Sequence, residues 1–65
     1  MKPIGSKAKV VENDCNGFEI GQVVYFTGMS TEYYHPPIPG MFNFQEKIDG
    51  GLDQDLEKHE FEWID

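Results

Sequence analysis

The sequence has little positive charge and few residues that cross-link small proteins. Five lysines and no arginine stand against twelve aspartates and glutamates, so the formal charge is −7. Because proteins meet nucleic-acid phosphates with lysine and arginine, this balance argues against direct nucleic-acid binding. The single cysteine excludes an internal disulfide and a cysteine-rich metal framework.

Long hydrophobic runs are also missing from the 65 residues. No stretch approaches the roughly 20 apolar residues that cross a bilayer, and no signal peptide is visible. We therefore expect a cytoplasmic protein with no membrane partner. A chain of this length buries only ~60% of the surface that its unfolded form exposes, which leaves room for one small core. We expect a single β domain over residues 1–65.

The charges that are present run from a basic start to an acidic end. Residues 1–11 hold three lysines and no acid (+3), residues 12–48 five acids and one lysine (−4), and residues 49–65 seven acids and one lysine (−6). One interpretation is solubility, since a net charge far from zero keeps a small domain dissolved. The other is a surface that binds a basic partner or imitates the phosphates which that partner holds.

Alternating apolar residues predict short strands over residues 7–12, 18–21, 41–45 and 60–64, and five consecutive β-branched or aromatic residues predict a strand over 23–27. Residues 49–51 predict a hairpin turn, and the proline-rich segment 28–40 is irregular. Residues 52–58 are ambiguous, because Leu52 and Leu56 also suit one helical turn. Four or five close strands favour a mainly β fold, either a small SH3-like barrel or a strongly curved antiparallel sheet.

The stretch from Lys9 to Val24 carries a resemblance. Its strand, Asn/Gly-rich loop, Phe-x-Ile-Gly segment and Val-Val strand resemble the opening of small SH3-like β-barrel accessory proteins of tailed bacteriophages. The resemblance implies that Phe18 and Ile20 plug the barrel, and that the protein is phage-encoded and acts in the host-cell cytoplasm. It implies a binding or structural role without an active site. The proline-rich insertion at 28–40 departs from that family.

No arrangement of residues indicates catalysis or a metal. His35 and His59 lie 24 positions apart, and neither the Cys-x-x-Cys nor the His-x-x-x-His spacing of a zinc site occurs. Acids at alternate positions in 53–57 match the start of a calcium loop, but Lys58 occupies the position that requires glycine. Cys15 lies beside Asp14, whose charge disfavours a reactive thiolate. We expect no enzyme activity, no metal and no cofactor.

A protein-binding surface is the remaining prediction. Aromatic residues make up 14% of the chain, more than a small barrel can bury, so some rings should lie exposed beside carboxylates. Segment 33–39 is either a binding loop or a rigid loop that covers the core. We expect the partner to contact two tyrosines and five acids: Tyr33, Tyr34, Asp53, Asp55, Glu57, Glu60 and Glu62.

Two functions follow from these features. The first is a module that inhibits or modulates a host nucleic-acid-handling protein, because carboxylates at alternate strand positions share a face and can stand in for phosphates. The second is a structural or assembly accessory, either a virion component or an oligomeric subunit, because oligomerisation would stabilise a marginal core.

Overall fold

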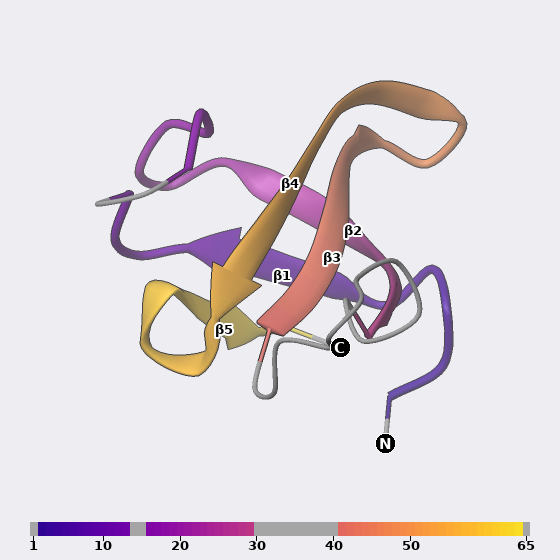
Figure 1. Cartoon of the computed structure of the whole chain (residues 1–65), viewed down its shortest axis with the longest axis horizontal. Helices are drawn as coiled ribbons and strands as arrows, with labels where there is room; N and C mark the ends of the chain where they lie inside the picture. The colour runs from indigo at the N-terminus through magenta and orange to yellow at the C-terminus, as the bar shows by residue number, and fades with distance from the viewer. Residues whose placement is uncertain (1, 14–15, 30–40, 65) are drawn as a thin grey trace, which may run out of the picture.

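The computed structural model describes residues 2–13, 16–29 and 41–64, and its five strands form one antiparallel sheet in the order β4-β3-β2-β1-β5 (Figure 1). The elements along the chain are β1 (Lys7–Val10), β2 (Val23–Met29), β3 (Met41–Lys47), β4 (Gly50–Glu57), the 3-10 turn η2 (Lys58–Glu60) and β5 (Phe61–Trp63). The predicted mainly β fold of short antiparallel strands is confirmed. The sheet is strongly bent and open, since β4 and β5 do not pair within the described residues.

Buried and more exposed side chains alternate along β2. β2 buries Val24 and Phe26, and it runs past Gly28 to Met29 with a shift of register against β3 between Phe26 and Gly28. β1 lies between β2 and β5, so Ala8 is opposite both Val24 and Trp63. β1 and β5, the first and last described strands in chain order, are thereby neighbours in the sheet.

Residues 18–21 do not form the predicted strand. Phe18 is buried, but the chain turns immediately after it, and the Gln22 N–H donates to the Glu19 carbonyl at 3.1 Å. Gly21 has a φ of 91°, which only glycine adopts without strain. Ile20 lies in this turn and is 64% exposed, so the expectation that it plugs the core is wrong.

Residues 52–57 belong to strand β4 rather than to a helical turn. β4 pairs with β3 through Glu57, with Leu56 opposite Phe42 and Gln54 opposite Phe44. The helical geometry begins one step later, in η2. The spacing of Leu52 and Leu56 fits a strand as well as a helix, because four residues equal two strand periods and place both side chains on one face of β4. The β3–β4 hairpin turns at residues 48–49.

The core lies on the inner face of the bent sheet, and four of its eight buried apolar residues are phenylalanines. Trp63 packs edge-on against Phe26 and Phe61, with ring centroids 5.3 and 5.1 Å apart, and Phe44 lies 4.7 Å from Phe61. Such tilted and edge-to-face pairs add about 0.5–1.5 kcal/mol each to the burial of area. The buried apolar residues are Ala8, Val10, Phe18, Val24, Phe26, Phe44, Leu56 and Phe61.

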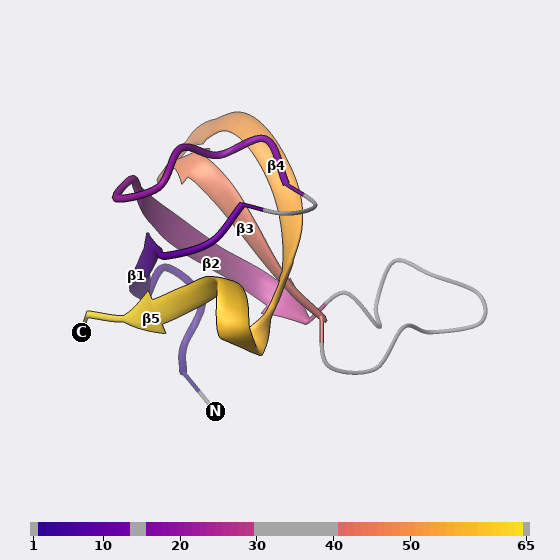
Figure 2. The same ribbon diagram turned by 90° about the vertical axis from the view of Figure 1, so that its left-hand side faces the viewer.

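The open side of the sheet is covered by the segment between β1 and β2, residues 11–13 and 16–22 (Figure 2). It reaches β4 through the Gly17 N–H, which donates to Gln54 Oε1 at 3.1 Å. It reaches η2 through the Val11 N–H and the Asn16 side chain, which both donate to Glu60. Individual hydrogen bonds therefore hold this side of the sheet together, whereas a closed barrel would use the backbone hydrogen bonds of two paired strands.

Candidate protein-binding surface

The outer face of β4 carries three carboxylates, Asp53, Asp55 and Glu57, which we call the acidic row. They occupy alternate positions of one strand, opposite Gln45, Asn43 and Met41 of β3. Alternate residues point to the same side of a sheet about 6.6–6.8 Å apart, so the row presents its charges on one face. Asp53 and Glu57 are exposed and Asp55 is half-buried.

Asn43 holds two members of the row in place. Its Nδ2 donates to Asp53 Oδ1 at 2.5 Å and to Asp55 Oδ1 at 3.0 Å. The opposite end of the amide accepts from the Thr27 hydroxyl on β2. Asn43 is only 8% exposed, so this network joins three strands under the surface. It fixes two like charges side by side, because one amide nitrogen serves both carboxylates.

Glu57 closes the row and also begins η2. Its backbone N–H donates to Glu60 Oε1 at 2.9 Å, and its carboxylate accepts from the backbone N–H of Glu60 in return. Reciprocal bonds of this kind satisfy donors that a helical turn leaves without partners. The Glu57 side chain is 59% exposed, so it keeps contact with solvent while it caps the turn.

Glu60 does not lie on the surface that the sequence suggested. Its exposed fraction is 1%, and its two carboxylate oxygens accept hydrogen bonds from Asn16 Nδ2 and from the Glu57 backbone. The even spacing of Glu60 and Glu62 implies a shared face only if both belong to one strand. Glu60 belongs to η2, which turns its side chain inward, and it is withdrawn from the predicted binding surface.

Glu62 is exposed but separated from the acidic row. It lies on β5, at the opposite end of the strand order from β4, and it is directly opposite Lys9 of β1. Opposite charges directly across a strand pair attract each other. The five predicted acids therefore divide into three groups: the row on β4, buried Glu60, and Glu62 beside a lysine.

The predicted aromatic part of the surface is largely absent from the described residues. Tyr33 and Tyr34 lie outside them. The seven described rings are each buried or half-buried, and Tyr25 is the one that stands on the outer face, opposite Gln45. The expectation that rings lie exposed beside the carboxylates therefore does not hold for this part of the chain.

Sequence reasoning missed Asn43 and Asn16, which position the carboxylates. The signal for Asn43 was present, since a polar residue between Phe42 and Phe44 must point to the outer face of a strand. Nothing in the sequence indicates that its partners are Asp53 and Asp55, because that depends on the register of the β3–β4 hairpin. Asn16 meets Glu60 across 44 positions, which local patterns do not reveal.

Comparisons with known proteins add no relative. No protein-family model matches the chain, and neither a curated protein nor a solved structure matches it. In the described part of the chain, no helix has the length and apolar character that a bilayer crossing requires.

Proposed function

We propose that this protein is a non-catalytic binding module that attaches to a protein partner with a basic surface, through the acidic row of β4. The observation that carries the proposal is the Asn43 amide, which holds Asp53 and Asp55 together on one face. Two carboxylates fixed side by side lose little side-chain entropy when lysines or arginines of a partner bind them. Charge complementarity would also speed association.

In its finer form, the proposal is that the partner handles nucleic acid and that the acidic row occupies its phosphate-binding surface. The net charge of −7 without arginine supports this, as does the regular spacing of charge along one strand. A phage-encoded module that modulates a host enzyme in the host cytoplasm is the setting that the resemblance of residues 9–24 favours. An SH3-like barrel ancestry belongs to the same proposal.

The test compares two double variants with equal net charge. D53N/D55N removes two charges of the acidic row, and E19Q/E62Q removes two exposed charges elsewhere. Each tagged protein is incubated with bacterial lysate and washed at 50 mM and 500 mM NaCl. The captured protein is then identified, purified and titrated with each variant in the presence of double-stranded DNA.

The expected result is a partner that E19Q/E62Q still binds, that D53N/D55N loses, and that DNA displaces. Binding that resists 500 mM NaCl, or that falls equally in both variants, contradicts the proposal. A partner that D53N/D55N loses but DNA does not displace keeps the acidic-row surface and removes the phosphate mimicry.

A structural or assembly role is the second candidate, and exposed apolar side chains favour it. Ile4, Ile48 and Ile64 are 71%, 72% and 50% exposed, respectively. Burial of such side chains against other copies or subunits would stabilise a small fold. Sedimentation equilibrium separates the two functions, since a defined oligomer at micromolar concentration supports assembly and a monomer at high concentration argues against it.

A further inference from the structure

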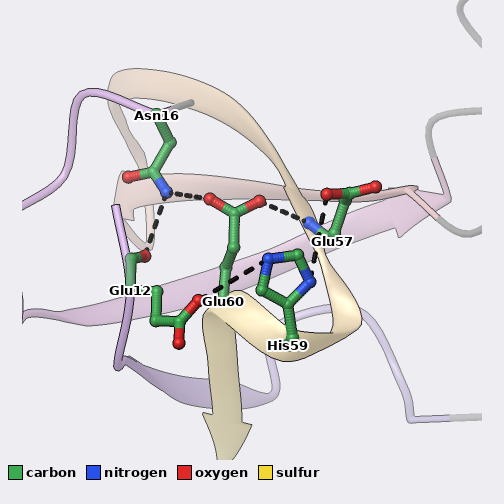
Figure 3. A network of polar contacts seen from close by, with 5 residues as sticks. All are labelled: Glu12, Asn16, Glu57, His59 and Glu60. Carbon is green, nitrogen blue, oxygen red and sulfur yellow. Dashed lines mark hydrogen bonds and ion pairs between the residues drawn. The ribbon is translucent and has the colours of Figure 1, made fainter. Parts of the chain in front are cut away.

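Five polar side chains meet where the β1–β2 segment contacts η2: Glu12, Asn16, Glu57, His59 and Glu60 (Figure 3). We call this group the polar junction. Glu57 is shared with the acidic row, but its other members lie off the outer face of β4. Figure 3 shows the Glu60 carboxylate between Asn16 and Glu57, with the His59 ring between Glu12 and Glu57.

The Glu60 carboxyl group is buried and hydrogen-bonded to uncharged donors. Its partners are an amide nitrogen, Asn16 Nδ2 at 2.8 Å, and a backbone nitrogen, Glu57 N at 2.9 Å. Among the described residues, no lysine forms an ion pair with it. Buried charges in proteins are ordinarily paired with a counter-charge or coordinate a metal ion. A cation at this point would supply a counter-charge to the carboxylate.

His59 has the orientation of a metal-binding imidazole. Its Nδ1 lies 3.9 Å from Glu57 Oε2, and one ligand atom from each of Glu57, His59 and Glu60 falls within 4.8 Å of the others. Its Nε2 faces Glu12 Oε2 at 3.6 Å. Metal-bound histidines usually donate their second ring N–H to a carboxylate or carbonyl, which fixes the tautomer. Glu12 is placed to accept that bond.

We propose that Glu57, His59 and Glu60 bind a divalent first-row transition metal ion, with zinc the foremost candidate, and that Glu12 orients the imidazole from behind. One imidazole nitrogen and carboxylate oxygens are a zinc donor set, at about 2.0–2.2 Å from the ion. The donor atoms must close by roughly 1 Å to reach that geometry. The side chains of Glu57 and His59 are 59% and 55% exposed, so packing in the core does not restrict their rotamers.

The consequence of this site is a metal-dependent link between two parts of the fold. Glu12 follows β1, whereas Glu57, His59 and Glu60 come from the end of β4 and from η2. An ion held there would tighten the contact that closes the open side of the sheet. Because the metal would bind the folded chain and not the unfolded one, it would raise the stability of the folded state.

The test is calorimetric titration of the full chain with zinc chloride, repeated on H59Q, E12Q, H35Q and C15S. H35Q and C15S remove the other histidine and the lone thiol, which are the competing ligands for this metal. D53N/D55N is the electrostatic control, because it lowers the negative charge without touching the proposed ligands. His59 is exposed, so H59Q should keep the fold, and two-dimensional NMR spectra verify this for each variant.

We expect one saturable zinc site per chain, lost in H59Q and weakened by about 10- to 100-fold in E12Q. H35Q, C15S and D53N/D55N should bind as the unchanged chain does. Zinc should raise the melting temperature of the unchanged chain but not that of H59Q. Absence of saturable binding, binding that survives H59Q, or binding that is lost in H35Q or C15S would overturn the proposal.

Discussion

Glu60 and Glu62 are chemically identical, lie two positions apart and meet opposite environments. Glu60 is 1% exposed and accepts hydrogen bonds from two segments of the chain, whereas Glu62 faces solvent opposite Lys9. The difference arises because η2 ends between them, which changes the direction of the side chains. At the scale of the residue, a carboxylate in this protein is therefore either a structural acceptor or a surface charge.

Replacement of each glutamate by alanine should separate these two roles. Glu60→Ala leaves Asn16 Nδ2 and the Glu57 N–H without their acceptor, so we expect the free energy of unfolding to fall by about 2 kcal/mol or more. Glu62→Ala should change it by less than about 0.5 kcal/mol. Urea unfolding monitored by Trp63 fluorescence measures both, and equal losses would contradict the structural role of Glu60.

Asn43 allows a second prediction, about two like charges held together. Asn43→Ala removes hydrogen bonds to two carboxylates, so stability should fall by about 1.5–3 kcal/mol. In the D53N/D55N background, Asn43→Ala should lower the stability by less, because the repulsion between the two carboxylates is absent there. Gln45→Ala, two positions along the same face of β3, is the control and should stay within about 0.5 kcal/mol. A loss that is the same in both backgrounds would show that the charges are not coupled through Asn43.

At the scale of the element, local sequence patterns were sufficient for β1, β2, β3 and β5 and insufficient for residues 18–21 and 52–58. Where bulky residues alternate without glycine, as from Met41 to Gln45, strand is the one pattern that fits. Leu52 and Leu56 fit a helix and a strand equally, and pairing with β3 decides between them. Asp53, Asp55 and Glu57 were predicted as one acidic cluster, and pairing with β3 arranges them in a row. The burial of Glu60 accompanies a contact with Asn16 that spans 44 positions.

The turn after Phe18 gives a prediction that tests the correction to the expected core. Phe18 is 2% exposed, so Phe18→Ala should lower the free energy of unfolding by about 3–5 kcal/mol. Ile20 is 64% exposed, so Ile20→Ala should cost less than about 0.5 kcal/mol. Chemical unfolding of the two variants measures these changes. A large fall in the free energy of unfolding of Ile20→Ala would restore the interpretation in which both side chains plug the core.

At the scale of the whole molecule, the net negative charge destabilises the compact folded state. A net charge of −7 on a chain with a Cα radius of gyration of 10.7 Å places carboxylates within one Debye length of one another at moderate salt. Self-repulsion of this kind destabilises a compact state. The acidic row adds to this repulsion locally, and the exposed apolar residues carry no charge that could reduce it.

Salt should therefore stabilise the folded chain. The melting temperature should rise when NaCl increases from 10 mM to 500 mM, because the Debye length falls from ~30 Å to a few ångströms. The rise should be smaller in D53N/D55N, which removes two of the closest charges. Differential scanning calorimetry measures both proteins, and a melting temperature that falls with added NaCl would mean that attractive ion pairs dominate the surface.

The position of β1 between β2 and β5 has a consequence for how the protein is made. Translation proceeds at about 5–20 residues per second, so residues 7–10 leave the ribosome seconds before residues 61–63 have been added. During that interval Ala8 and Val10 lack the Trp63 and Phe61 side of their pairing. A nascent chain of this protein thus carries an unfinished sheet until its final strand emerges, and that interval is when a chaperone would find it.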